Sequence, residues 1–274
     1  MFRRYKPFFR AGAMNCFAYK FQIASWLLIT LLEVACLAFL WIGVYKNSTT
    51  DVINGFTVKE MLVYMVFINV FGFNVFTANS METIADEIQT GTISASFTKP
   101  VNYRLRLMAS TLGLTFAQSV ILCLPVLAIS YAVFFALGYI VVSSVWTFLA
   151  NLALFFLSEL IAVLLYDGID YICGLFCFYT TAAWGVSQLK HVIISFLSGG
   201  LIPLSFFPSS LSKLVEYSPF SGIAQNPVLI LMGRMNYADA LAKIGIALGW
   251  WMVIEVLAKL FFTVASKKIT VQGG

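Results

Sequence analysis

Long apolar segments recur along the whole chain, and they constrain its fold more than any other feature. Each is long enough for an α-helix to cross the hydrocarbon core of a bilayer, which takes about 20 predominantly apolar residues. Hydrophobic residues make up 61% of the 274 positions and charged residues only 11%. A soluble globular domain carries about a quarter charged residues. The sequence therefore predicts an integral membrane protein of the all-α class.

Six segments are expected to cross the membrane, and together they form a single transmembrane domain over residues 1–274. The spans are placed at about 21–45, 61–79, 107–137, 145–180, 184–207 and 241–265. Asp167 and Asp170 leave two interpretations of the fourth segment, one long helix or a helix followed by a cytoplasmic turn, and we take it as one span. Pro125 predicts a kink in the third span.

The distribution of basic residues predicts the orientation of the spans. Five lie before the first span, three in the loop after the second span and two at the C-terminus, against four in the other connections. By the positive-inside rule, both termini then lie in the cytoplasm. The basic and aromatic segment 1–20 suits a helix in the membrane interface, in contact with lipids. This pattern accounts for the net charge of +5 without a nucleic-acid partner, and we expect a multi-pass protein of a bacterial inner or plasma membrane.

Three glutamates lie near the middle of predicted spans: Glu33, Glu159 and Glu255. An ionised carboxylate in the hydrocarbon costs several kcal/mol and usually faces a bundle interior or an aqueous cavity. In one interpretation the three line a substrate pathway or a proton relay. In the other they form hydrogen bonds between helices or stay protonated. The sequence alone leaves both open.

The motifs of common nucleotide-binding and catalytic sites do not occur in the sequence. It contains no G-x-x-x-x-G-K-[ST] loop, no H-E-x-x-H helix and no G-x-S-x-G elbow. We therefore expect no catalytic residue, metal or cofactor in this chain, so any ATP is hydrolysed elsewhere. A lipid-modifying membrane enzyme that uses Glu159, Asp167, Asp170 and His191 is an alternative, although these residues form no recognisable constellation in the sequence. A second alternative is a non-exporting carrier, either an energy-coupled importer or a secondary carrier.

The loop after the second span contains the polar stretch "DEIQTGTISASFTKP". Ser80 and Gly91 can begin and end a helix here, and Ile84 and Ile88 share one face at a spacing of four residues. Glu87 is assigned to the polar face. The pattern predicts a short amphipathic helix on the cytoplasmic side, which serves either as a connector or as a docking surface for a partner.

Two motifs resemble those of ABC type-2 transporter permeases. The first is "EIQTGTI" at 87–93 with Lys99-Pro100 after it, which is similar to the family's inner-loop element E-[IV]-x-x-G-T-[LI] followed by [RK]-P. The second is "LSGGLIPLSFFP" at 197–208, followed by Ser218-Pro219-Phe220, Pro227 and Gly233, which is similar to the Gly/Pro series after the family's fifth span.

The resemblance implies the membrane subunit of an ATP-driven exporter. Two permeases, identical or homologous, would form the pathway, and each would dock on a separate ABC ATPase subunit whose dimer binds ATP and Mg. The inner-loop element would be the coupling helix that contacts the ATPase, over Met81 to Gly91. The residues carried over to ATPase docking are Ile84, Glu87, Ile88, Gly91 and Thr92. By analogy with the family, the cargo would be lipophilic or amphipathic.

The same resemblance implies short re-entrant outer helices after the fifth span, which close the external end of the pathway. The residues carried over to this outer gate are Gly199, Gly200, Pro203, Pro208, Pro219 and Pro227. The expected fold is thus six transmembrane helices with an N-terminal interfacial helix, a cytoplasmic coupling helix and short re-entrant outer helices.

Overall fold

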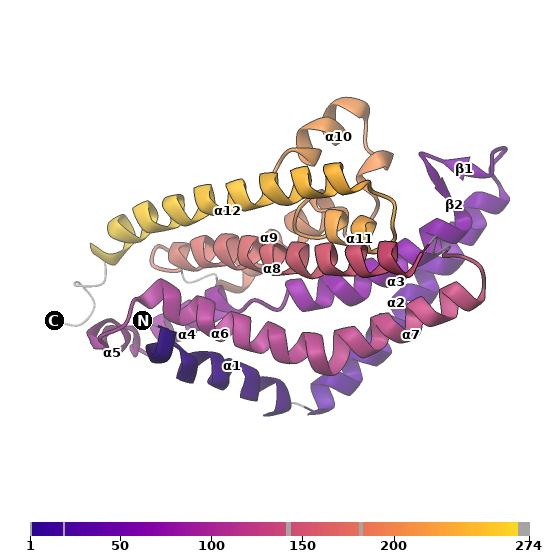
Figure 1. The fold of residues 1–274 in the computed structure, drawn as a ribbon. Helices are drawn as coiled ribbons and strands as arrows, with labels where there is room; N and C mark the ends of the chain where they lie inside the picture. The colour runs from indigo at the N-terminus through magenta and orange to yellow at the C-terminus, as the bar shows by residue number, and fades with distance from the viewer. Residues whose placement is uncertain (1, 19, 141–143, 181–182, 268–274) are drawn as a thin grey trace.

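The computed structural model describes residues 2–18, 20–140, 144–180 and 183–267, and these ranges are almost wholly helical (Figure 1). The α-helices are α1 (Lys6–Ala18), α2 (Lys20–Lys46), α3 (Val58–Val75), α4 (Ser80–Gln89), α5 (Ile93–Thr98), α6 (Tyr103–Gln118), α7 (Leu124–Ala136), α8 (Val145–Phe176), α9 (Ala183–Leu197), α10 (Ser209–Glu216), α11 (Gln225–Leu231) and α12 (Tyr237–Ala265). Short 3-10 helices lie at Phe2–Arg4 and Leu204–Phe206.

A small antiparallel hairpin, β1 (Val52–Ile53) and β2 (Phe56–Thr57), joins α2 to α3. Asn54 and Gly55, between the strands, have φ of 47° and 83°. Positive φ at both central residues is what a two-residue hairpin turn of type I′ requires, and Asn-Gly is the favoured pair for it.

Five helical segments of the described chain are long and apolar enough to cross a membrane. They are Leu27–Lys46, Val58–Gln89, Tyr103–Ala136, Val145–Phe176 and Tyr237–Ala265. The structure has one continuous helix over the fourth segment, where the sequence left a helix followed by a turn as the other interpretation.

The predicted span at 184–207 is not one helix. Its helical part, α9, has 15 residues and ends at Leu197, after which Gly199 adopts a φ of 83°. At 1.5 Å per residue, 15 residues rise about 22 Å, which is less than the hydrocarbon core of about 30 Å. The Gly/Pro-rich sequence that carries the family resemblance therefore also ends this helix early.

Helix α3 runs through the centre of the bundle and packs against α2, α7, α8 and α11. Its side chains Met61, Tyr64 and Phe67 are completely buried. A capping box begins the helix: the Thr57 hydroxyl accepts from the N–H of Glu60, and the Glu60 carboxylate accepts from the N–H of Thr57. Because both free amides are satisfied, the helix starts sharply after the hairpin.

A π-helical segment, Ser119–Cys123, connects α6 to α7 without ending the helical rod. It lies just before Pro125, where the sequence predicted a kink. Proline lacks the N–H that would bond to the carbonyl group four residues earlier, and its ring crowds that carbonyl group. The irregular turn lies where that bond would be missing.

Helix α1 packs lengthwise against α6, beside which it runs in Figure 1. A Cβ atom on Gly12 would lie 2.0 Å from the carbonyl oxygen of Ser110, and one on Gly113 would lie 1.9 Å from that of Phe9. Only glycine permits so close an approach of two backbones. The segment predicted as an interfacial helix is therefore fixed to the first half of the α6–α7 rod.

Two short helices, α10 and α11, lie between α9 and α12. Helix α11 is mostly buried and packs against α8, whereas α10 is mostly exposed and stands out from the bundle at the top of Figure 1. Neither is long enough to cross a membrane.

Candidate functional site

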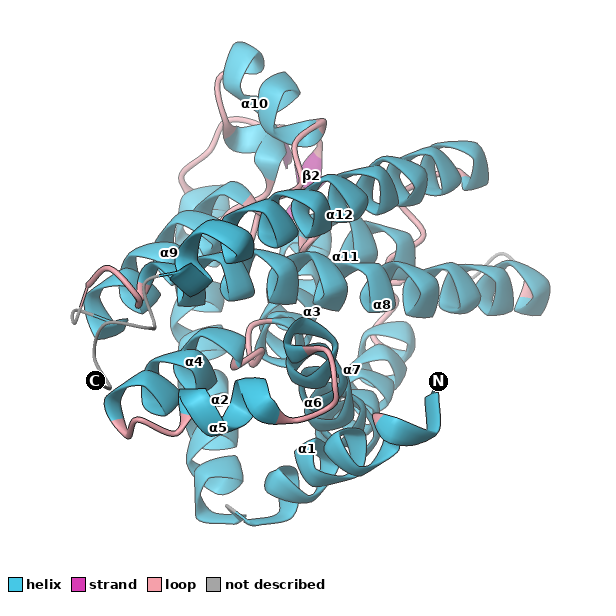
Figure 2. Cartoon of the chain, turned by 90° about the vertical axis from the view of Figure 1, so that its left-hand side faces the viewer, coloured by secondary structure: helices cyan, strands magenta, loops and turns pink. Residues whose placement is uncertain are grey.

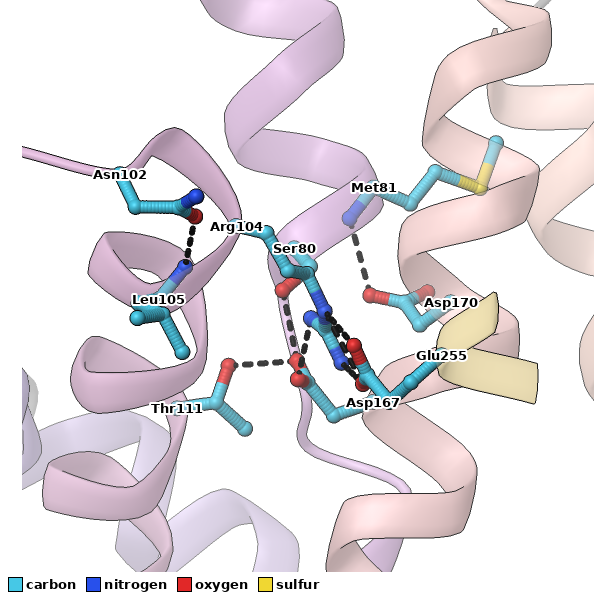
Figure 3. Close-up of polar contacts among 9 residues, drawn as sticks. All are labelled: Ser80, Met81, Asn102, Arg104, Leu105, Thr111, Asp167, Asp170 and Glu255. Atoms are coloured by element: carbon cyan, nitrogen blue, oxygen red, sulfur yellow. Dashed lines mark hydrogen bonds and ion pairs between the residues drawn. The ribbon is translucent and has the colours of Figure 1, made fainter. Parts of the chain in front are cut away.

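Charged side chains gather where α4 meets the ends of the long helices. This polar junction, as we call it, consists of Ser80, Met81, Arg104, Thr111, Asp167, Asp170, Lys190 and Glu255. It joins α4 to α6, α8, α9 and α12 (Figure 3, which omits Lys190). Seen from this end of the bundle, α4 and α5 lie across the ends of other helices (Figure 2).

Arg104, on α6, is the centre of the junction. Its Nη1 atom lies 2.6 Å from Oδ2 of Asp167 on α8, and its Nε atom lies 3.1 Å from Oε1 of Glu255 on α12. The guanidinium also lies over the ring of Tyr171, 4.7 Å from the ring centroid. A planar guanidinium that engages two carboxylates and an aromatic face fixes the relative positions of three helices.

Two aspartates of α8 hold the first turn of α4. The Ser80 hydroxyl donates to Oδ1 of Asp167 at 2.6 Å, and the Met81 N–H donates to Oδ2 of Asp170 at 2.9 Å. Lys190 of α9 pairs with the other oxygen of Asp170. Negative charge at a helix N-terminus interacts favourably with the helix dipole and with the free amides there.

Helix α4 begins at Ser80, as the sequence indicated, but Ser80 is not its N-cap residue. Asn79 occupies the N-cap position and makes no side-chain cap bond. A carboxylate from a different helix, Asp170, satisfies the amide instead, and a cap supplied from so far along the chain leaves no local sequence signal.

Glu87 of α4 forms a second, smaller polar group. Its carboxylate accepts from Nη2 of Arg106 at 2.7 Å, from the Tyr103 hydroxyl at 2.8 Å and from the Ser96 hydroxyl at 3.1 Å. Glu87 is buried, which contradicts its assignment to the exposed polar face. Positions 84, 87 and 88 are spaced i, i+3, i+4 and share one helix face, so Glu87 turns inward together with Ile84.

Helix α4 packs very closely on α8 at Gly174. A Cβ atom there would lie 2.6 Å from Cδ1 of Ile84 and 3.0 Å from the Cα atom of Met81. Ile84 itself is 0% exposed. Glycine at this position lets α4 come close enough for the two aspartates of α8 to reach its first turn.

The five residues assigned to ATPase docking thus differ in their exposure. Ile84 and Glu87 face the bundle, and Ile88 is half-buried between them and the surface. Gly91 and Thr92 are exposed at the end of the helix, and Gly91 has the positive φ, 72°, that ends a helix.

The three intramembrane glutamates also separate. The Glu159 carboxylate accepts hydrogen bonds from the amide of Asn74 and the hydroxyl of Ser119, so it joins α8 to α3 and the π-helical segment. Glu255 pairs with Arg104 in the polar junction. Glu33 differs from both, because it is exposed and lines a cavity between α2, α3 and α9.

The residues assigned to an outer gate lie in the segment between α9 and α12. Gly199 follows α9, and its carbonyl oxygen accepts from the buried Tyr64 hydroxyl at 2.7 Å. Gly200 continues that turn, and a Cβ atom on it would lie 2.9 Å from the carbonyl oxygen of Ser195. The four prolines mark the ends of short elements: Pro203 precedes the 3-10 helix, Pro208 precedes α10, Pro219 lies in the following turn and Pro227 lies in the first turn of α11.

Sequence reasoning missed the polar junction as a unit. Arg104 enters the sequence argument only as one of the three basic residues of the inner loop. Asp167 and Asp170 enter it at the boundary of the fourth span and as polar groups of the alternative enzyme, but not as partners of Arg104 or of α4. One signal was available: two acids at a spacing of three residues in an apolar segment share one helix face and require partners.

The fold defines a multi-pass membrane protein of the all-α class, with five helical segments in the described residues that are apolar and long enough to cross a membrane. Comparison with known protein families adds its identity: the ABC-2 family transporter proteins match residues 31–273, and the chain belongs to that family. A search of curated proteins finds no match. The resemblance inferred from the two motifs is confirmed, and membership implies an ATPase partner that uses ATP.

Proposed function

We propose that this chain is the permease subunit of an ATP-driven exporter. Two permeases, identical or homologous, form the substrate pathway, and each couples to one subunit of an ATPase dimer that binds ATP and Mg. The chain itself catalyses no reaction. Family membership and the attachment of α4 to the bundle support this proposal.

The attachment of α4 is the observation that carries the proposal. One side of the helix is held by Asp167 and Asp170, and the opposite side is exposed at Asp86 and Gln89. Ion pairs join the same aspartates to Arg104 of α6 and to Lys190 of α9, and Arg104 pairs in turn with Glu255 of α12. A displacement of α4 is therefore transmitted to those helices. A partner that binds the exposed side can therefore move the bundle.

Within this scheme the predicted docking residues have different roles. Gly91, Thr92 and the exposed side of α4 contact the ATPase, and Ile88 lies at the edge of that contact. Ile84 and Glu87 fasten the helix to the permease and transmit its movement.

The remaining topology completes the scheme. Helix α9 and the turn after it make the sixth crossing with a shortened helix, and both termini lie in the cytoplasm. The segment from Gly199 to Pro227, with α10 and α11, forms the outer gate as re-entrant helices. The burial of α11 against α8 is consistent with a gate supported by the transmembrane helices.

Co-purification of this chain with an ABC ATPase subunit from its native membrane tests the proposal. We expect the double variant Asp86→Arg, Gln89→Arg to retain less than a tenth of the ATPase that the unchanged chain retains in mild detergent. Asp51→Arg is the matched control, because Asp51 is exposed beside the β-hairpin, at the other end of the molecule in Figure 1, and should leave retention unchanged. Equal retention by the double variant, or no retention by the unchanged chain, would overturn the proposal.

A further inference from the structure

A cavity of about 310 Å³ lies between α2, α3 and α9. Its wall includes Glu33 from α2, Asn69, Phe73 and Phe76 from α3 or its C-terminal end, and His191 and Ser195 from α9. Pockets for small organic ligands begin at about this volume and combine apolar walls with a few polar groups. The cavity thus has the size and the lining of a small-molecule site.

The charge of the cavity is one-sided. Among the described residues, Glu33 is the single acidic residue that lines it, and no lysine or arginine lines it. In the part of the chain that the structure describes, the Glu33 carboxylate has no hydrogen bond or ion pair. Glu159 and Glu255, the other glutamates within apolar spans, both have partners from neighbouring helices. His191, the other titratable residue of the described wall, interacts electrostatically with Glu33 but forms no ion pair with it. A carboxylate in a membrane segment without a hydrogen bond or an ion pair is unfavourable, so a bound cation would stabilise Glu33.

The basic residue nearest in sequence to this wall is already engaged. Lys190, next to His191, pairs with Asp170 and lies over the ring of Tyr166. It is therefore held in the polar junction and is not directed to Glu33. The cavity keeps its negative character although a lysine adjoins one of its lining residues.

Aromatic rings form the apolar part of the wall. The Phe76 and His191 rings meet edge to face, with centroids 5.4 Å apart and an interplanar angle of 79°, and the Phe73 side chain lines the cavity beside them. Faces of aromatic rings attract organic ammonium groups, and the attraction increases when the cation is desolvated. A carboxylate beside phenylalanine rings is suited to a cation that carries an apolar body.

We infer that this cavity binds an organic cation, with its ammonium group at Glu33 and its apolar body against Phe73 and Phe76. The inference names a substrate class for the proposed exporter. Only the assignment of the organic cation as cargo rests on that proposed function. Binding itself requires neither the ATPase nor transport, and can be measured on this chain alone.

Titration of the purified chain in dodecyl maltoside, an uncharged detergent, tests the inference. The probes are phenyltrimethylammonium and benzenesulfonate, which carry opposite charges on similar rings, and saturation-transfer NMR reports their binding. We expect saturable binding of the cation that is at least tenfold tighter than that of the anion. Equal binding of the two, or no saturable binding of the cation, would overturn the inference without any variant.

Variants locate the binding. We expect Glu33→Gln to weaken binding of the cation at least tenfold, whereas Glu33→Asp keeps the charge and retains most of it. Phe76→Leu should weaken binding about threefold, a modest part of the cation–π range. Asp51→Asn, which removes an exposed acid far from the cavity, is the control and should have no effect.

Unchanged cation binding in Glu33→Gln would show that the cation binds elsewhere and would overturn the assignment. This result is distinguishable from failure of the proposed function. Loss of co-purification with the ATPase contradicts the exporter and leaves the titration unaffected, whereas absence of charge-selective binding contradicts the cavity and leaves ATPase association unaffected.

Discussion

The polar junction and the α2–α3–α9 cavity both contain carboxylates among apolar helices, but they differ in whether those carboxylates have partners. In the junction, Asp167, Asp170 and Glu255 each have a cationic partner, and the two aspartates also accept hydrogen bonds from α4. In the cavity, Glu33 has neither among the described residues. The comparison shows that the role of an acidic residue in a membrane segment depends on its partners. The paired acids hold helices together, and the unpaired acid is available to a ligand.

Removal of a paired charge should have the largest effect on stability. Asp167→Asn leaves Arg104 with Glu255 alone, and breaking a buried ion pair typically costs about 3–5 kcal/mol. We expect the free energy of unfolding to fall by about 3 kcal/mol, measured by SDS titration in dodecyl maltoside. Asp51→Asn is the matched exposed control. A loss below about 1 kcal/mol would show that the pair does not hold the helices.

A change in packing at the same place should have an intermediate effect. Gly174→Ala adds a methyl group 2.6 Å from Cδ1 of Ile84 and 3.0 Å from the Cα atom of Met81, so the buried Ile84 side chain or α4 itself must shift. Overpacking of this kind costs about 1–3 kcal/mol. Ile84→Val, which removes the clashing Cδ1 atom, should restore part of the loss when combined with Gly174→Ala. Unfolding titrations of both single variants and the double variant give the coupling energy, and purely additive losses would rule out the contact.

The unpaired charge should matter least to stability. Glu33→Gln removes no hydrogen bond or ion pair with another described residue, and surface substitutions of this kind usually change stability by less than about 0.5 kcal/mol. The same SDS titration checks this value. A loss as large as that of Asp167→Asn would mean that Glu33 serves the fold, and the contrast between the two regions would disappear.

The local sequence pattern predicted the helices better than it predicted which side chains contact one another. The apolar runs indicated the long helices, and the composition of the inner loop indicated α4, with Gly91 at its end. The inward direction of Glu87 follows from its spacing to Ile84 and could have been read from the sequence. The early end of α9 is also visible in Gly199, Gly200 and Pro203, which follow it, but the apolar residues among them concealed the break.

The junction could not be predicted in the same way. Arg104 and Glu255 are 151 residues apart, and no periodicity within a helix indicates which distant side chain a charge will meet. For the same reason the sequence could not separate Glu33 from Glu159 and Glu255. All three are glutamates inside apolar runs, and only the packing of other helices around each one decides whether it has a partner.

The π-helical turn between α6 and α7 changes the direction in which later side chains point around the axis of the helical rod. One extra residue rotates everything after it by about 100° relative to a continuous α-helix. Before the turn, Arg104 and Thr111 point toward the acids of α8, and after it, Tyr131 stacks on Phe67 of α3. The two halves of one rod can therefore select different neighbours, so that a charged contact face at one end does not have to continue as a charged stripe along the whole membrane.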